Sequence, residues 1–199
     1  MRSFSALSLF LIILSVTPAK CQKSLRLDWS LGPTNSPSFE SCSTQSVTMQ
    51  ASDPTKAGVP PYYMISYELG GTPRISLLGT NRSELKWTAV HAAGSKLILS
   101  LADSEGNTGG IPSFVYFVEA GNSDCLPQIP DSSDFTVSAN VTSVADTCEP
   151  WGLRIKGGVK PYNLTLLQLN SAVVTNVTMG KDDDAFTFIN RGNPGTLFA

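Results

Sequence analysis

Gly58-Val59-Pro60-Pro61-Tyr62-Tyr63-Met64-Ile65 recurs 100 residues later as Gly158-Val159-Lys160-Pro161-Tyr162-Asn163-Leu164-Thr165. Each stretch begins with glycine, which tolerates positive φ, and continues with proline, which fixes φ near about −65°. Each therefore predicts a turn that leads into a strand. Because recurrence at a fixed period is the signature of a repeated unit, we expect two copies of one fold.

Further landmarks recur around these stretches in the same order. They are the cysteines Cys42 and Cys148, the alternating segments Leu25–Trp29 and Phe135–Ala139, the aromatic segments Trp87–Val90 and Phe186–Ile189, and the glycine-led segments Gly94–Ile98 and Gly195–Ala199. Chance agreement among turns does not predict a shared order, so the pattern favours duplication of a domain.

The repeated unit has β character. The predicted strands are rich in β-branched and aromatic residues and lie at 46–50, 62–67, 85–90, 97–101 and 114–118. Several alternate between polar and apolar residues, as half-buried strands do, and glycine, proline and asparagine separate them. No window after residue 20 has a helical period. The pattern predicts an all-β fold of the β-sandwich type.

The cysteines suggest where the first sandwich begins and ends. Cys42 precedes the first of these strands and Cys125 follows the last, so we expect a Cys42–Cys125 disulfide within a domain spanning residues 22–130. On the chain-entropy model such a loop gives roughly 4 kcal/mol of stabilisation. Cys148 holds the position of Cys42 in the second copy, and we expect it to be unpaired.

The second copy, residues 131–199, ends at Ala199, which aligns with Ile98 of the first copy. We therefore expect an incomplete second sandwich. Its missing strand would be replaced only if residues 25–29 or 135–141 covered the gap.

Composition and the N-terminus limit the classes of function. The net charge of −2 provides no basic surface for nucleic acid, and the 41% share of hydrophobic residues is enough for a packed core. Arg2, the apolar run 7–14 and small residues at 17 and 19 form the pattern of a secretory signal peptide, predicted to span residues 1–19 or 1–21. No later apolar run is long enough to span a membrane.

These features predict a secreted protein. Four N-glycosylation sequons agree with export through a eukaryotic secretory pathway, and their acceptors are Asn81, Asn140, Asn163 and Asn176. An oxidising compartment also permits the predicted disulfide.

The ordered landmarks resemble those of fungal secreted or membrane-anchored proteins with tandem immunoglobulin-like sandwiches. In the first copy they are Cys42, Gly58, Pro61, Tyr62, Trp87, Gly94, Ser95, Leu97, Asp103, Ser104, Gly106 and Cys125. In the second they are Cys148, Gly157, Gly158, Pro161, Tyr162, Phe186, Gly195 and Thr196. The resemblance implies a tandem immunoglobulin-like fold, and relatives of this kind often carry a membrane helix after the repeats.

Few residues offer chemistry. His91 is the only histidine, and we expect it on a surface loop because Asn190 aligns with it in the second copy. Asp103–Asn107 resembles the start of a calcium loop but is interpreted as a turn, and Asp182–Asp184 as a solvated loop. Multi-ligand zinc sites are nearly excluded by the single histidine and four cysteines.

Aromatic residues could form a platform for carbohydrate, and the candidates are Tyr62, Tyr63, Tyr67, Trp87 and Trp151. We expect Trp87 in the core instead, because a tryptophan on a central strand usually fills a sandwich.

From these observations we expect a non-enzymatic extracellular interaction or spacer module without a cofactor, whose partner is an extracellular protein or a glycan. The alternative is a carbohydrate-binding or carbohydrate-active secreted protein.

Overall fold

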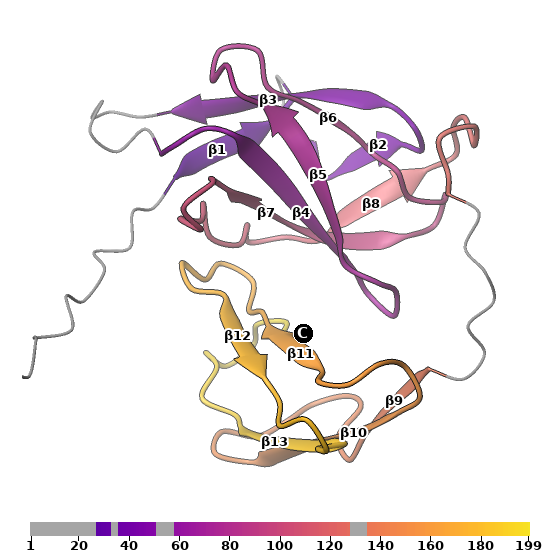
Figure 1. Ribbon diagram of the computed structural model, residues 1–199, viewed down its shortest axis with the longest axis vertical. Helices are drawn as coiled ribbons and strands as arrows, with labels where there is room; N and C mark the ends of the chain where they lie inside the picture. The colour runs from indigo at the N-terminus through magenta and orange to yellow at the C-terminus, as the bar shows by residue number, and fades with distance from the viewer. Residues whose placement is uncertain (1–26, 33–35, 51–57, 128–134) are drawn as a thin grey trace, which may run out of the picture.

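The structure, a computed structural model, describes residues 27–32, 36–50, 58–127 and 135–199. It consists of two β units, unit 1 (residues 27–127) and unit 2 (residues 135–199), with unit 2 below unit 1 in Figure 1. The predicted signal peptide lies outside the described residues. Within the described residues no helix forms, and no segment could cross a membrane as a helix.

The described part of unit 1 contains eight strands. They are β1 (Asp28–Leu31), β2 (Ser38–Glu40), β3 (Thr44–Gln50), β4 (Tyr62–Glu68), β5 (Arg74–Gly79), β6 (Lys86–Thr88), β7 (Lys96–Ala102) and β8 (Tyr116–Glu119). They form a three-stranded sheet in the order β1-β3-β6 and a five-stranded sheet in the order β2-β8-β7-β4-β5. All pairings are antiparallel except the parallel pair β2–β8. The predicted all-β fold of the β-sandwich type is confirmed.

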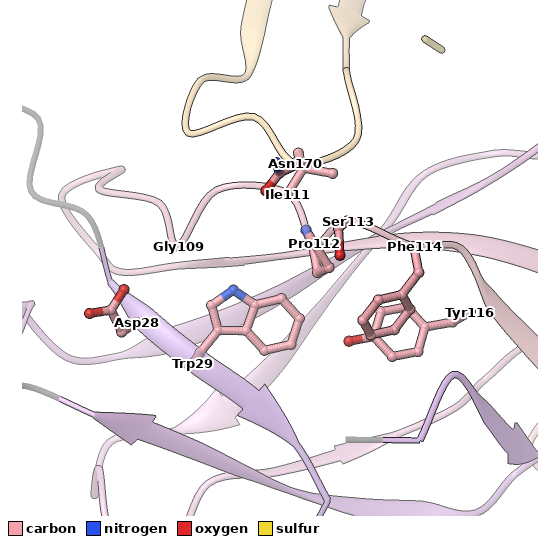
Figure 2. Close-up of a pocket in the computed structure, with 9 residues that line it drawn as sticks. All are labelled: Asp28, Trp29, Gly109, Ile111, Pro112, Ser113, Phe114, Tyr116 and Asn170. Carbon is pink, nitrogen blue, oxygen red and sulfur yellow. The ribbon is translucent and has the colours of Figure 1, made fainter. Parts of the chain in front are cut away.

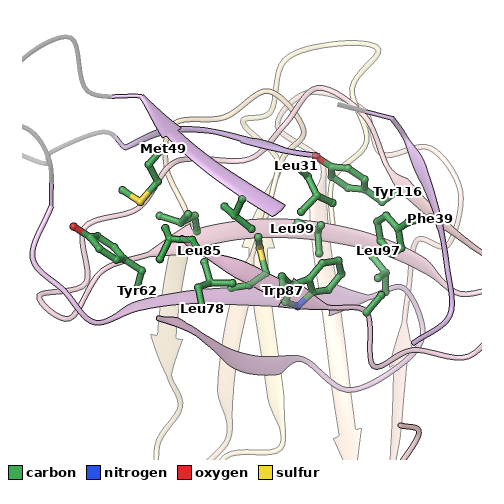
Figure 3. Close-up of a cluster of buried hydrophobic side chains, with 14 of the residues drawn as sticks. Leu31, Phe39, Met49, Tyr62, Leu78, Leu85, Trp87, Leu97, Leu99 and Tyr116 are labelled. Atoms are coloured by element: carbon green, nitrogen blue, oxygen red, sulfur yellow. The ribbon is translucent and has the colours of Figure 1, made fainter. Parts of the chain in front are cut away.

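Period-two alternation places one row of each sheet in the core of unit 1. Figure 3 shows this core, in which Trp87 is 2% exposed and meets Phe39 edge-on at 5.2 Å. The core also contains Leu31, Val47, Met49, Tyr62, Met64, Leu78, Leu85, Leu97, Leu99, Tyr116 and Val118. The expectation that Trp87 fills the sandwich is therefore confirmed.

Five strands make up the described part of unit 2. They are β9 (Thr136–Ala139), β10 (Pro150–Lys156), β11 (Asn163–Leu166), β12 (Thr175–Thr178) and β13 (Ala185–Ile189). One sheet has the order β13-β10-β9 and the other joins β11 to β12. The last residues continue the smaller sheet, since the Leu167 N–H donates to the Ala199 carbonyl and Gln168 pairs with Phe198.

The two units share local geometry at several aligned positions. The peptide bonds before Pro61 and Pro161 are both cis, and Cys42 and Cys148 both have positive φ, at 59° and 66°. The Cys42 N–H donates to the Ala89 carbonyl at 2.9 Å, and the Cys148 N–H donates to the Asn190 carbonyl at 2.8 Å. The aligned landmarks of the sequence thus occupy similar local conformations.

Unit 2 packs on the face of the five-stranded sheet that points away from the unit 1 core. Ile98 on β7 and Ile111 are buried there against Leu167, with Tyr67, Val115, Leu169, Val174 and Ala199 around them. Two backbone hydrogen bonds cross the junction, from Ile111 N–H to Ser171 O at 2.7 Å and from Asn170 N–H to Pro112 O at 2.9 Å. This contact explains why Leu97–Ala102 of β7 is buried on both faces.

Candidate binding surfaces

The disulfide predicted from the sequence is present. Cys42 and Cys125 are bonded, with Cα atoms 5.6 Å apart across a sequence separation of 83 residues. The bridge ties the segment between β2 and β3 to the segment after β8. Among the described cysteines, Cys148 is free and exposed.

All four sequon asparagines are exposed. Asn81 follows β5, and Asn140 follows β9 with its Nδ2 donating to the Pro150 carbonyl at 3.0 Å. Asn163 and Asn176 lie on neighbouring strands of unit 2, β11 and β12.

The acidic segments are turns. Asp103 is 4% exposed, and its carboxylate accepts hydrogen bonds from the backbone N–H groups of Val59, Glu105 and Asn107 and from the Asn107 side chain. Burial alone would raise the pKa of Asp103, but these hydrogen bonds outweigh it and lower the pKa. Asp182–Asp184 lie exposed, and Asp184 pairs with Arg154 at 3.3 Å. No group of three or more metal-ligating residues occurs in the described part of the chain.

The expectation that His91 lies on a surface loop is wrong. His91 is 2% exposed, its Nε2 lies 2.8 Å from Ser66 Oγ, and its Nδ1 lies 3.0 Å from Glu68 Oε2. Ser66 and Glu68 are alternate residues of β4, so their side chains share the face that points towards the unit 1 core. Sequence reasoning missed this network because the partners are 25 and 23 residues from His91.

The Ser66–His91–Glu68 order is that of a hydrolase triad, but its surroundings differ from those of a catalytic site. Ser66 is 1% exposed in the interior of a strand, and its Oγ also lies 3.5 Å from the Arg74 carbonyl. Burial lowers the pKa of His91, although the nearby Glu68 carboxylate acts to raise it. The lowered pKa keeps the imidazole ring neutral. We interpret the three side chains as a polar network that fixes β4 against the segment after β6.

The most exposed large apolar residues of unit 1 lie on the outer face of the five-stranded sheet. Tyr63 pairs with Leu77 and Ile65 pairs with Ile75 across β4 and β5. We call these four residues the outer-face quartet. Ile75 is 72% and Leu77 is 63% exposed, so unit 2 leaves them open to solvent. Isolated exposed apolar residues are ordinary, but a contiguous apolar group marks an interaction site.

The aligned positions of unit 2 are all polar. After Pro161, Asn163 pairs with Thr178 and Thr165 pairs with Asn176 across β11 and β12. The two pairs form hydrogen bonds of 2.8 Å, and each joins the asparagine of one sequon to the threonine of the other. Because this sheet position accepts polar residues in unit 2, the apolar quartet of unit 1 is not a requirement of the fold.

A pocket of about 250 Å³ lies at the junction of the units. Trp29 of β1 faces Phe114 and Tyr116 in it, and Asp28 and Asn170 add polar groups, as Figure 2 shows. The rings of Phe114 and Tyr116 are 4.9 Å apart. Burial raises the pKa of Tyr116 to about 12.

Glycine permits the close approaches that shape this pocket. A Cβ atom on Gly109 would lie 2.1 Å from Trp29 Cδ1. A Cβ atom on Gly110, which has a φ of +72°, would lie 2.8 Å from the Ser171 carbonyl of unit 2. Glycine at both positions therefore allows the loop before β8 to contact both β1 and unit 2.

The pocket uses none of the five aromatic residues proposed from the sequence. Tyr62 and Trp87 are buried in the unit 1 core, Tyr63 and Tyr67 lie on the outer face of β4, and Trp151 donates a hydrogen bond to the Val141 carbonyl at 2.9 Å. Trp29 and Phe114 belong to predicted strand segments, but only the packing of β1 beside the loop before β8 brings them together.

Comparison of the chain with known protein families finds no family that matches. Comparison with curated proteins also finds no match. The function must therefore be argued from these surfaces alone.

Proposed function

We propose that this chain is a non-enzymatic, exported interaction module that binds a protein through the outer-face quartet of unit 1. The observation that carries this proposal is the contrast between aligned positions. Tyr63, Ile65, Ile75 and Leu77 expose apolar groups where unit 2 has two asparagines and two threonines. An exposed apolar group on a rigid sheet is the kind of surface that a protein partner desolvates.

The proposal includes export and glycosylation. The N-terminal signal pattern and four exposed sequon asparagines support it, and the Cys42–Cys125 disulfide is compatible with an extracellular location. Glycans on Asn163 and Asn176 would cover the outer face of β11 and β12, leaving the equivalent face of unit 1 bare.

We further propose that the two units are immunoglobulin-like copies of one ancestral domain, as the resemblance to fungal tandem-sandwich proteins implies. The shared order of β1-β3-β6 and β9-β10-β13, together with the aligned cis prolines and cysteines, supports this reading. In this reading the Leu169 N–H to Leu197 O bond of unit 2 corresponds to the Leu69 N–H to Lys96 O bond of unit 1.

Export is tested by expressing the whole chain in a eukaryotic secretory host. Mass spectrometry of the medium should find protein that begins after Ala19 or Cys21 and loses mass on enzymatic deglycosylation. The Asn163→Gln and Asn176→Gln variants should each be lighter than the parent by the mass of one glycan before deglycosylation. Secreted protein that retains Leu9, or that is unchanged by deglycosylation, would contradict this part of the proposal.

Binding is tested by screening the secreted chain against an array of extracellular protein domains. Ile75→Ser and Leu77→Ser should abolish any signal of the parent chain, because they remove exposed apolar groups without touching the core. Val173→Ser is the matched control, since Val173 is a 66% exposed apolar residue of unit 2. A signal that persists in the Ile75 and Leu77 variants would place the binding surface elsewhere.

A second candidate function is carbohydrate binding in the junction pocket. The rings of Trp29 and Phe114 beside Asp28 and Asn170 favour it, because sugars are bound by rings together with hydrogen-bonding groups. On a glycan array Trp29→Ala should remove binding, whereas Leu77→Ser should leave it unchanged. An array on which the parent chain gives no signal would exclude this candidate.

A further inference from the structure

Strand β5 is one of the two edge strands of the five-stranded sheet, and β2 is the other. In the order β2-β8-β7-β4-β5 it is the last strand, and among the described residues it pairs with β4 alone. Proteins commonly protect such an edge with proline, an inward-pointing charge or a bulge. Arg74–Gly79 contains no proline, and its only charge, Arg74, stands at the start of the strand.

The irregularity that is present lies at one end of β5. The register between β4 and β5 shifts between Tyr62 and Tyr63, opposite the last residues of β5. Ile75, Ser76 and Leu77 pair regularly with Ile65, Met64 and Tyr63. The central part of this edge is therefore regularly paired and can serve as a template for another strand.

The sequence of β5 is complementary to itself. If two copies pair antiparallel with Ser76 opposite Ser76, Ile75 of each copy lies opposite Leu77 of the other, on the same face. Each quartet then continues into the other, so that the two form one apolar surface. The two Arg74 side chains stand at opposite ends of the ladder, and no like charges face each other.

This apolar surface adjoins the contact between unit 1 and unit 2. The row of Tyr67, Ile98 and Val115 lies next to the quartet on the same sheet face, and it packs against Leu167 and its neighbours in unit 2. The outer face of the sheet thus packs against unit 2 around β7, and the quartet lies between that contact and the edge strand β5.

We propose that a second copy of this chain binds at β5, antiparallel about Ser76, so that two five-stranded sheets form one continuous sheet. The pairing is isologous and closes with two-fold symmetry, so it stops at a dimer. This inference rests on the proposed function, because it names the partner of the same quartet. Asn81 would lie outside the paired strand residues Arg74–Gly79.

The test is sedimentation of the secreted full chain over a range of concentrations. The chain should form a dimer, and Ile75→Lys should remove it, because a charge would then face the apolar Leu77 of the other copy. Val173→Lys should remain dimeric. A chain that is monomeric throughout, or a dimer unaffected by Ile75→Lys, would overturn the inference.

Cross-linking tests the register directly in a background with Cys21→Ser and Cys148→Ser, so that a mature chain beginning after Ala19 carries no other unpaired cysteine. Ile75→Cys and Leu77→Cys proteins should each remain uncross-linked alone and should form a disulfide-linked dimer when mixed under oxidation. Cross-linking of either protein alone would contradict pairing about Ser76.

Sedimentation and the binding screen together distinguish the dimer from binding of a different protein. A monomer whose binding to another extracellular domain is abolished by Ile75→Ser would refute the second copy and support the proposed function. A monomer with no such binding would refute both.

Discussion

The Ser66–His91–Glu68 network shows how a buried polar group is tolerated in a sandwich. His91 has a partner at each ring nitrogen, and Glu68 also accepts a hydrogen bond from Ser95 Oγ at 2.6 Å. Burial would raise the pKa of Glu68, but hydrogen bonds from Ser95 and His91 and the nearby charge of Arg74 lower it. A neutral imidazole beside an ionised carboxylate satisfies both groups.

We predict that the stability of unit 1 decreases as the pH falls below about 6.5. The folded-state pKa of His91 is lowered by burial, so the unfolded chain binds the proton more readily and acidification favours unfolding. Urea unfolding of the parent chain should show a lower free energy at pH 5.5 than at pH 7.5.

The His91→Gln variant isolates this effect, because other groups also titrate. It should be less stable than the parent at pH 7.5 by about 1–3 kcal/mol, the cost of incomplete hydrogen bonding in a buried site. The difference in the free energy of unfolding between the variant and the parent should become smaller as the pH falls. A difference that is constant between pH 7.5 and 5.5 would show that His91 does not titrate with unfolding.

At the scale of elements, the disulfide joins the segment before β3 to the segment after β8. Cys42 precedes β3 and Cys125 follows β8, and the Cys125 N–H lies 3.2 Å from Cys42 Sγ. The bridge therefore closes β3 to β8 into one long loop and restricts the unfolded chain more than a local bridge would.

We predict that Cys42→Ser combined with Cys125→Ser lowers the free energy of unfolding by about 2–4 kcal/mol. The reason is the lost constraint on the unfolded chain, and chemical denaturation measures it. Cys148→Ser should change stability by less than about 0.5 kcal/mol, because Cys148 is exposed and unbonded. A double variant as stable as the parent would show that the closed loop does not restrict the unfolded state.

At the scale of the whole molecule, the junction makes unit 2 part of the packing of unit 1. Leu167 is 2% exposed although it lies beyond the last residue of β11, because Ile98 and Ile111 cover it. The Ile111 N–H donates to Ser171 across the same contact, so its hydrogen exchange reports whether the units are docked.

We predict that Leu167→Ala weakens the docking of the two units by about 2–5 kcal/mol, the cost of a buried leucine truncation. Exchange of the Ile111 amide should become faster, whereas amides in the centre of β7 should change less. Val173→Ala should have no such effect because its side chain is 66% exposed. Unchanged exchange at Ile111 in the Leu167 variant would mean that the units dock through other contacts.

Local patterns in the sequence were sufficient for several strands, the turns and the disulfide, but they did not predict β2, β5 or β10. Alternation depends on neighbouring residues, and glycine and proline act on their own backbone, so β3, β4, β7 and β8 are recognisable without knowledge of what covers them. Cysteines that bracket a predicted sandwich likewise suggest their own pairing. The all-β fold follows from these signals.

Only the tertiary structure determined which side chains are buried around His91 and which lie together on the exposed sheet faces. His91 reads as a loop residue because nothing near it in the chain predicts that Ser66 and Glu68 will cover it. The outer-face quartet exists only once the register sets Ile75 opposite Ile65, and the crossed sequons only once Asn163 meets Thr178. A shift of one residue would send these side chains to the other face, so register, a property of paired strands, determined what the sequence could not.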